Sequence, residues 1–258
     1  MTDLDKELFE TLSWDDANIF EVQRILDAGA NLNARNDNNL QKTPLHCAPN
    51  SDVAEILIEN GADVNALDEY KATPLHCART AGIAQILIAN GADVNARDEY
   101  QQTPLHYAEN LAVAGVLIRN GADIHARDFQ NETPLHTVIN PDIVKKLITI
   151  GADVNAKNNV GATPLHSVVG IEKTEFLIEN GADVNAKDDF GRTPLHELCF
   201  YRPDDEEFRL DNVEIAKLMV AHGADVNAKT TNGETALDCA KHNDYAEMVE
   251  YLVSVGAQ

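Results

Sequence analysis

The sequence predicts a mostly α-helical protein built from stacked repeats, and three observations lead to this prediction. The tetrapeptide Thr-Pro-Leu-His recurs at a constant spacing of 30 residues and begins at Thr43, Thr73, Thr103, Thr133, Thr163 and Thr193. A Gly-Ala-Asp-Val-Asn-Ala phrase or a close variant follows in phase, with its glycine at Gly61, Gly91, Gly121, Gly151, Gly181 and Gly223. Between the two phrases runs an apolar segment with helical spacing. Such self-similarity is typical of a repeat array in which each unit buries its apolar face against its neighbours.

The chain begins with two predicted helices that lack the tetrapeptide. Residues 3–28 place Leu4, Leu8, Phe9 and Leu12 on one apolar face and Ile19, Val22, Ile25 and Leu26 on another, with Trp14 in the turn between the helices. Terminal repeats are expected to be atypical, because one of their sides faces water. We therefore interpret residues 1–36 as an N-terminal cap.

Each internal repeat reads as a helix, a turn, a second helix and an extended loop. Thr is a favoured helix N-cap, and Pro is tolerated at the first helical position, where its missing N–H costs nothing. The glycine that ends the second apolar run is a natural helix terminator, since glycine readily takes positive φ. A polar stretch such as residues 187–192 then predicts a turn before the next Thr.

These two phrases resemble ankyrin repeats, and the resemblance covers nearly the whole chain. It implies pairs of helices with projecting β-hairpin fingers, stacked into a solenoid. The family period is about 33 residues, whereas this chain uses 30. The shortfall falls between the two phrases, most naturally at the end of the first helix. The sequence therefore predicts a first helix shorter by about one turn in five successive repeats, and an altered groove where the family has its concave face.

The sixth repeat departs in the opposite direction. It is 12 residues longer between its two phrases than its neighbours, and the extra residues run from about Phe200 to Asn212, which we interpret as an acidic loop. The last repeat is degenerate, with Thr-Ala-Leu-Asp beginning at Thr235. We predict a single domain over residues 1–258, with six internal repeats over 37–230, an insert near 200–212 and a C-terminal cap over 231–258.

Composition and charge narrow the function classes. The chain has 43 Asp and Glu against 20 Lys and Arg, a net charge of −23, yet 44% of its residues are hydrophobic, which is a globular composition. So acidic a chain is a poor ligand for nucleic acid or anionic membranes, and charge favours a basic partner. No apolar run approaches the roughly 20 residues of a membrane helix. The acidic N-terminus lacks a signal-peptide pattern, and four dispersed cysteines favour a reducing compartment, so we expect a cytoplasmic location.

Repeating polar residues invite catalytic or metal hypotheses, but their spacing argues against them. The six motif histidines lie one repeat apart, roughly 10 Å, too far to share a zinc ion, so we expect each to hydrogen-bond the neighbouring repeat, as the family resemblance also implies. Cys47, Cys77 and Cys239 read as small buried apolar residues. No catalytic motif stands out. The sequence thus predicts no catalytic residues, metal site or cofactor, and no enzyme.

Positions that vary between repeats are free to carry recognition. The fingertip position, three residues before each motif Thr, is rich in apolar and aromatic side chains, and with its neighbour Phe129 the candidate fingertip residues are Leu40, Tyr70, Tyr100, Phe129, Val160 and Phe190. An acidic rim of Asp68, Glu69, Asp98, Glu99, Asp128 and Asp189 lies beside them. Aromatic anchors with an acidic rim suit a partner that carries apolar groups and Lys or Arg. Packing of one finger against the next is the competing interpretation, and the two are compatible.

The sequence therefore predicts a non-catalytic protein–protein interaction module that binds a partner protein through its fingers and concave face, as a monomer. Two alternatives remain open at this point. The same row of fingertips could serve self-assembly into a structural scaffold. The family resemblance also includes effectors or adaptors of a bacterium or virus that are delivered into a host cell.

Overall fold

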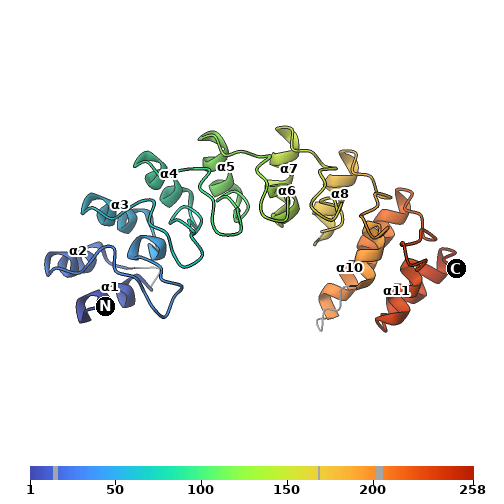
Figure 1. The fold of residues 1–258 in the computed structure, drawn as a ribbon, viewed down its shortest axis with the longest axis horizontal. Helices are drawn as coiled ribbons and strands as arrows, with labels where there is room; N and C mark the ends of the chain where they lie inside the picture. The colour runs from blue at the N-terminus through green and yellow to red at the C-terminus, as the bar shows by residue number, and fades with distance from the viewer. Residues whose placement is uncertain (14–16, 168, 201–205) are drawn as a thin grey trace. The chain divides into compact units, whose positions relative to one another are not determined.

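The computed structural model describes residues 1–13, 17–167, 169–200 and 206–258, and it separates into two compact units, residues 1–129 and 130–258. Trp14, predicted in the first turn, lies outside the described residues. Each unit contains short helices joined by tight turns, in the order of the chain (Figure 1). This arrangement confirms the mostly helical stack of repeats expected from the sequence.

In the first unit the cap helices are followed by three repeats. The elements are α1 (Asp3–Leu12), α2 (Ile19–Asp27), the 3₁₀ turn η1 (Pro44–Cys47), α3 (Ser51–Glu59), α4 (Ala81–Ala89) and α5 (Leu111–Arg119). Helices α2, α3, α4 and α5 pack side by side in sequence order, while α1 packs against both α2 and η1 (Figure 1). The second helices thus form one layer, and the first helices or turns form the other.

The second unit continues the pattern and ends in longer elements. Its helices are α6 (Pro134–Thr137), α7 (Pro141–Thr149), α8 (Ile171–Glu179), α9 (Pro194–Phe200), α10 (Glu206–Ala221), α11 (Ala236–His242) and α12 (Ala246–Ser254). Helix α8 packs against α7 and α10, and α9 packs against α10 and α11. The core is formed by the motif leucines together with one face of each second helix, and every motif leucine from Leu45 to Leu195 is almost fully buried.

The prediction of shortened first helices is confirmed. After each Thr at 43, 73, 103, 133 and 163 the chain makes a single turn of four residues, whereas α9 and α11 contain seven residues each. The missing three residues are therefore those of the last turn of the first helix. The chain passes almost directly into the second helix. In four of these five repeats its N-terminus is capped through a side-chain oxygen, by Asn50, Thr80, Asn110 or Asn140, whereas α8 begins after Gly170.

Three sets of hydrogen bonds join one repeat to the next within each unit. The motif histidines bond forward through Nε2 to a backbone carbonyl, with distances of 3.0–3.4 Å for His46, His76, His136, His166 and His196. The asparagine of the glycine phrase bonds a peptide of the next repeat, as Asn65 does with the carbonyl of Gly91 and the N–H of Asp93. These contacts explain why both phrases recur in phase: each residue serves the adjacent repeat as well as its own.

The third set runs along the fingers. The carbonyl of each fingertip residue accepts a hydrogen bond from an N–H of the next finger at 2.8–2.9 Å, at Leu40, Tyr70, Tyr100, Gln130, Val160 and Phe190. Each finger is a tight turn, and the antiparallel bridge Asn36–Lys42 is the sole β-type pairing within the described part of the chain. The fingers are therefore stiffened mainly by their neighbours along the row.

The insert of the sixth repeat differs from the expected acidic loop. Residues 201–205 lie outside the described part, but residues 206–212 form the first turns of α10, which has 16 residues where the second helices of the preceding five repeats have nine. Much of the added length has therefore extended an existing helix, which satisfies the backbone hydrogen bonds of the added residues internally.

Candidate functional site

The fingertip residues predicted from the sequence are exposed in the structure. The exposed fraction lies between 38 and 76% for Leu40, Tyr70, Tyr100, Phe129, Val160 and Phe190. Four of these six side chains are aromatic, a type that contributes strongly to protein interfaces. The backbone beneath them is fixed by the finger-to-finger hydrogen bonds. The result in each unit is a row of apolar side chains on a preformed edge.

Part of this row also packs against itself. The rings of Tyr70 and Tyr100 lie 6.0 Å apart between centroids, tilted by 32°. In the second unit the guanidinium of Arg192 lies 5.0 Å from the centre of the Phe190 ring. Both interpretations made from the sequence therefore have a basis: the rings stiffen the row and still leave large exposed faces.

The predicted acidic rim needs correction at three positions. Asp68, Asp98 and Asp128 are only 1–8% exposed, so they do not belong to an exposed rim. The Oδ1 atom of Asp68 accepts hydrogen bonds from the N–H groups of Tyr70 and Ala72, both at 2.9 Å. Asp98 makes the same pair of bonds in the next finger. These carboxylates hold the finger turns, because a side-chain acceptor replaces the missing backbone partner there.

The remaining rim residues are exposed. Glu69, Glu99 and Asp189 directly precede Tyr70, Tyr100 and Phe190 in the chain. Each donates its backbone N–H to the preceding finger while its side chain faces solvent. The acidity beside the aromatic row is thus reduced to one carboxylate per finger at these three fingers.

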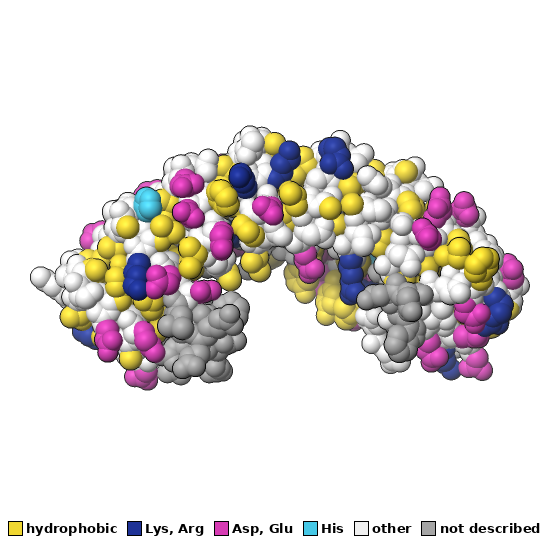
Figure 2. Space-filling view, turned by 180° about the vertical axis from the view of Figure 1, so that it is seen from behind, with side chains coloured by type: hydrophobic (Ala, Val, Ile, Leu, Met, Phe, Trp, Pro, Cys, Tyr) yellow, Lys and Arg dark blue, Asp and Glu magenta, His cyan; other side chains and the backbone are white. Residues whose placement is uncertain are grey.

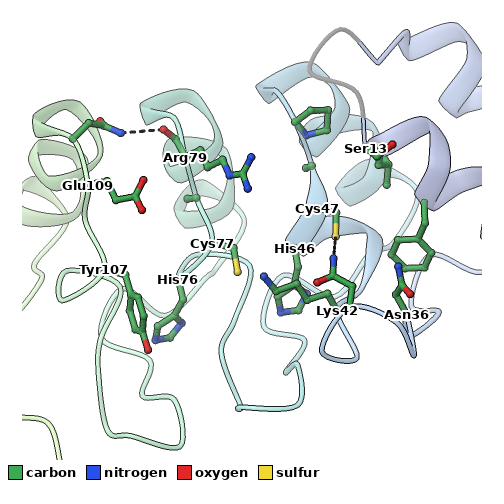
Figure 3. Close-up of a pocket in the computed structure, with 17 residues that line it drawn as sticks. Ser13, Asn36, Lys42, His46, Cys47, His76, Cys77, Arg79, Tyr107 and Glu109 are labelled. Carbon is green, nitrogen blue, oxygen red and sulfur yellow. Dashed lines mark hydrogen bonds between the residues drawn. The ribbon is translucent and has the colours of Figure 1, made fainter. Parts of the chain in front are cut away.

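A second candidate surface is a groove in the first unit, with a cavity volume of about 440 Å³ (Figure 3). It is lined at its base by His46, Cys47, His76, Cys77 and Tyr107, which are the ends of three successive one-turn first helices. Lys42, Arg79 and Glu109 supply its charged side chains. The groove lies where the shortened first helices leave space. An altered groove at this place was predicted from the sequence.

The two thiols of this groove differ from the sequence prediction. Cys47 and Cys77 were expected to be buried, but both are half-buried and line the cavity (Figure 3). Cys239 occupies the corresponding place in the last repeat, where the first helix has seven residues, and it is fully buried. The cysteine at this position is thus half-buried at the end of a one-turn first helix and buried within the longer α11. Desolvation raises the pKa of both groove thiols, so they remain protonated at neutral pH.

The motif histidines are occupied by structural hydrogen bonds. The Nε2 atom faces a carbonyl, which can only accept, so Nε2 carries the proton. Nδ1 then accepts from the backbone N–H of the motif Thr and from its hydroxyl, which lies 2.8–3.0 Å away in all six repeats. Among the described residues, no group of three or more His, Cys, Asp or Glu side chains could hold a metal ion.

Comparison with known protein families identifies the family of this chain. A family model described as ankyrin repeats (3 copies) matches residues 50–128, 109–188, 138–207 and 170–258. The chain belongs to the ankyrin-repeat family. None of the curated proteins compared with it matches.

Ankyrin repeats are generally protein–protein interaction modules, and the family is typically non-catalytic. On the face of this ankyrin protein seen in Figure 2, acidic and hydrophobic side chains are interspersed, and basic side chains occur singly or in small groups. None of the helices in the described ranges has the length and apolar character needed to cross a membrane.

The exposure of the fingertip side chains was predicted from the sequence, but most of the groove of this ankyrin protein was missed. Lys42, Arg79 and Tyr107 were not proposed as site residues, because the residue type at these positions varies along the chain. A usable signal was present: the three-residue shortfall lies directly after Cys47, Cys77 and Tyr107. Residues that flank a deleted helical turn lose their cover and become candidates for a binding surface.

Proposed function

We propose that this ankyrin protein is a non-catalytic module that captures a partner protein through the rows of fingertips in its two units. The observation that carries the proposal is the exposure of six apolar or aromatic side chains on fingers that are hydrogen-bonded to one another within each unit. Rigid aromatic side chains bury large areas at a low entropic cost, so they are suited to anchor a partner.

The charge around the row indicates the kind of partner. Glu69, Glu99 and Asp189 lie beside the exposed rings, and the chain as a whole carries a net charge of −23. A partner surface with apolar groups flanked by Lys or Arg complements both features. The acidic field also accelerates association with a basic partner, and added salt weakens this effect. With four free cysteines, the domain suits a reducing compartment such as the cytoplasm.

The double variant Tyr70→Ala/Tyr100→Ala tests the fingertips directly. It removes two exposed rings from the first unit and keeps the backbone bonds of the fingers, so the circular dichroism spectrum should be unchanged. Capture of partners from a lysate, followed by affinity measurement with the purified partner, should show a loss of tenfold or more. High salt should slow association of the wild type.

Phe20→Ala is the matched control, because Phe20 is 79% exposed but lies on the cap helix α2, away from the fingers. It should leave capture unchanged. Equal capture by the wild type and the tyrosine double variant would refute the role of the fingertips. Light scattering over a range of concentrations separates a monomeric binder from the self-assembling alternative, in which the tyrosine variant would dissociate the assembly.

A further inference from the structure

The groove of the first unit has a local charge opposite to that of the whole chain. The charged side chains among its lining residues are Lys42, Arg79 and Glu109, which sum to one positive charge, while the chain carries −23. Neither Lys42 nor Arg79 forms an ion pair with any residue that the structure describes. Neither cation is therefore neutralised by a described carboxylate at ion-pair distance, and both charges face the groove.

The base of the groove adds no further positive charge. Desolvation lowers the pKa of His46 and His76, so both imidazoles are neutral at pH 7, and their ring nitrogens are already engaged by Thr and by a carbonyl. The Tyr107 hydroxyl donates to Oδ2 of the buried Asp98 at 2.6 Å. The available charges therefore belong to Lys42 and Arg79.

The geometry brings these two cations to the same thiols. Figure 3 shows the Arg79 side chain reaching toward the repeat that carries Cys47, with Cys77 beside it and Lys42 on the far side near His46. Both lysine and arginine lie close enough to act electrostatically on the sulfur atoms of Cys47 and Cys77. An anionic group placed over the two thiols would face a cation on either side.

We propose that this groove binds an extended segment of a partner protein, with one Asp or Glu carboxylate seated between Lys42 and Arg79. A single carboxylate neutralises the local charge of the lining, whereas a phosphate at about −1.5 to −2 would leave an excess. Asn36 and Asn39 also line the groove; Oδ1 of Asn36 accepts from the N–H of Asn38, and Nδ2 of Asn39 donates to Sγ of Cys47. The Nδ2 group of Asn36 and the Oδ1 atom of Asn39 can bond a peptide backbone. This inference rests on the proposed protein-binding function but uses a different surface from the fingertips.

The test uses a displayed library of random nonapeptides, selected on the wild-type protein. Selected peptides should be enriched in Asp or Glu, and a synthetic selected peptide should lose tenfold or more in affinity for Arg79→Gln and for Lys42→Gln. Arg119→Gln is the control, since Arg119 ends α5 outside the groove and the substitution removes the same charge. A circular dichroism spectrum identical to that of the wild type verifies that each variant folds.

The native thiols report where the peptide binds. A bound peptide should slow alkylation of Cys47 and Cys77 by iodoacetamide, measured by mass spectrometry, while the buried Cys199 and Cys239 react slowly in every case. An absence of selected peptides, no acidic preference, undiminished affinity for Arg79→Gln, or unprotected groove thiols would each overturn the proposal.

The tyrosine fingertip variant keeps the two proposals apart. Tyr70→Ala/Tyr100→Ala should bind the selected peptide normally, because neither side chain lines the groove. If it loses the peptide, the peptide binds the fingertips and the groove proposal is wrong. If it binds the peptide and also captures the partner fully, the groove proposal stands while the fingertip proposal fails.

Discussion

Residues 1–129 and residues 130–258 contain the same repeating backbone but differ in the side chains at equivalent positions. The third residue of the second helix is buried and apolar in the first unit, at Val53, Ile83 and Val113, and again at Ile143 in the second. At Lys173 the same position holds a lysine that is 2% exposed. Its Nζ atom donates to the carbonyls of His136 at 3.1 Å and Val138 at 2.9 Å.

The fingers differ between the units in a second way. The residue after each fingertip has positive φ throughout, but in the first unit it is Gln41, Lys71 or Gln101, and in the second unit it is mostly glycine, as at Gly161 and Gly191. The comparison teaches that the repeat fixes the backbone geometry of a position and leaves the side chain to local neighbours. Substitutions at equivalent positions of different repeats can therefore serve as controls for one another.

The largest expected effect comes from exchanging the buried residues of α7 and α8. Ile143→Lys buries an ammonium group in an apolar position and should cost about 3–5 kcal/mol of stability. Lys173→Met keeps a long unbranched side chain and should be much better tolerated. Urea unfolding followed by circular dichroism measures both, and comparable losses in the two variants would show that the sites are not specialised.

The same lysine predicts a pH dependence with a definite sign. Burial lowers the pKa of Lys173 from its ordinary value of 10.5 to about 8. Between these two values the unfolded chain binds a proton that the folded chain lacks, so this group makes stability rise with pH, by about 3 kcal/mol in total. The difference in unfolding free energy between wild type and Lys173→Met should change by this amount from pH 8 to 10.5. A constant difference across that range would contradict the assignment.

The next effect concerns the glycine of the sixth finger. Gly191 has φ of 73°, and a Cβ there would lie 2.9 Å from the backbone nitrogen of Thr231. Gly191→Ala should therefore combine left-handed strain with a backbone clash and cost roughly 2–4 kcal/mol. Gly181→Ala is the matched control, since Gly181 has φ of 89° with nothing within 4 Å of its Cβ, and it should cost about 1 kcal/mol. Equal losses in thermal or urea unfolding would show that the close approach to Thr231 is unimportant.

The features that recur in every repeat could be predicted from the sequence. Six copies of one phrase and a missing three residues were enough to predict the helix pairs and the single-turn first helices, because each landmark has a fixed structural role. The role of a single carboxylate was harder to predict. Asp68 and Glu69 are adjacent acidic residues, yet Asp68 accepts two finger N–H groups and Glu69 is exposed. The position in the turn decides this and not the side-chain type, since Asp189 is exposed at the position equivalent to Glu69.

The groove and the buried lysine could not be predicted from residue type alone. Cys47 and Cys239 are the same residue at the same repeat position, yet Cys47 ends a one-turn helix and is half-buried, whereas Cys239 lies within the longer α11 and is buried. Lys173 interrupts an apolar register, but the sequence does not show that two carbonyls lie within reach of its Nζ atom. Both features depend on the surroundings of the residue in the fold and not on its type.

The smallest expected effect comes from placing a glycine, as found in the fingers of the second unit, into a finger of the first unit. Gln101 has φ of 62°, a conformation that costs an L-residue about 1–2 kcal/mol, while glycine adopts it freely. Gln101→Gly should stabilise the first unit by roughly 0.5–1 kcal/mol, because relief of strain outweighs the added entropy of the unfolded chain. Gln101→Ala should give no such gain, since alanine keeps the strain. A gain for alanine equal to that for glycine, measured by urea unfolding, would mean that the Gln101 side chain rather than its backbone is unfavourable, and the two fingers would then not differ in strain.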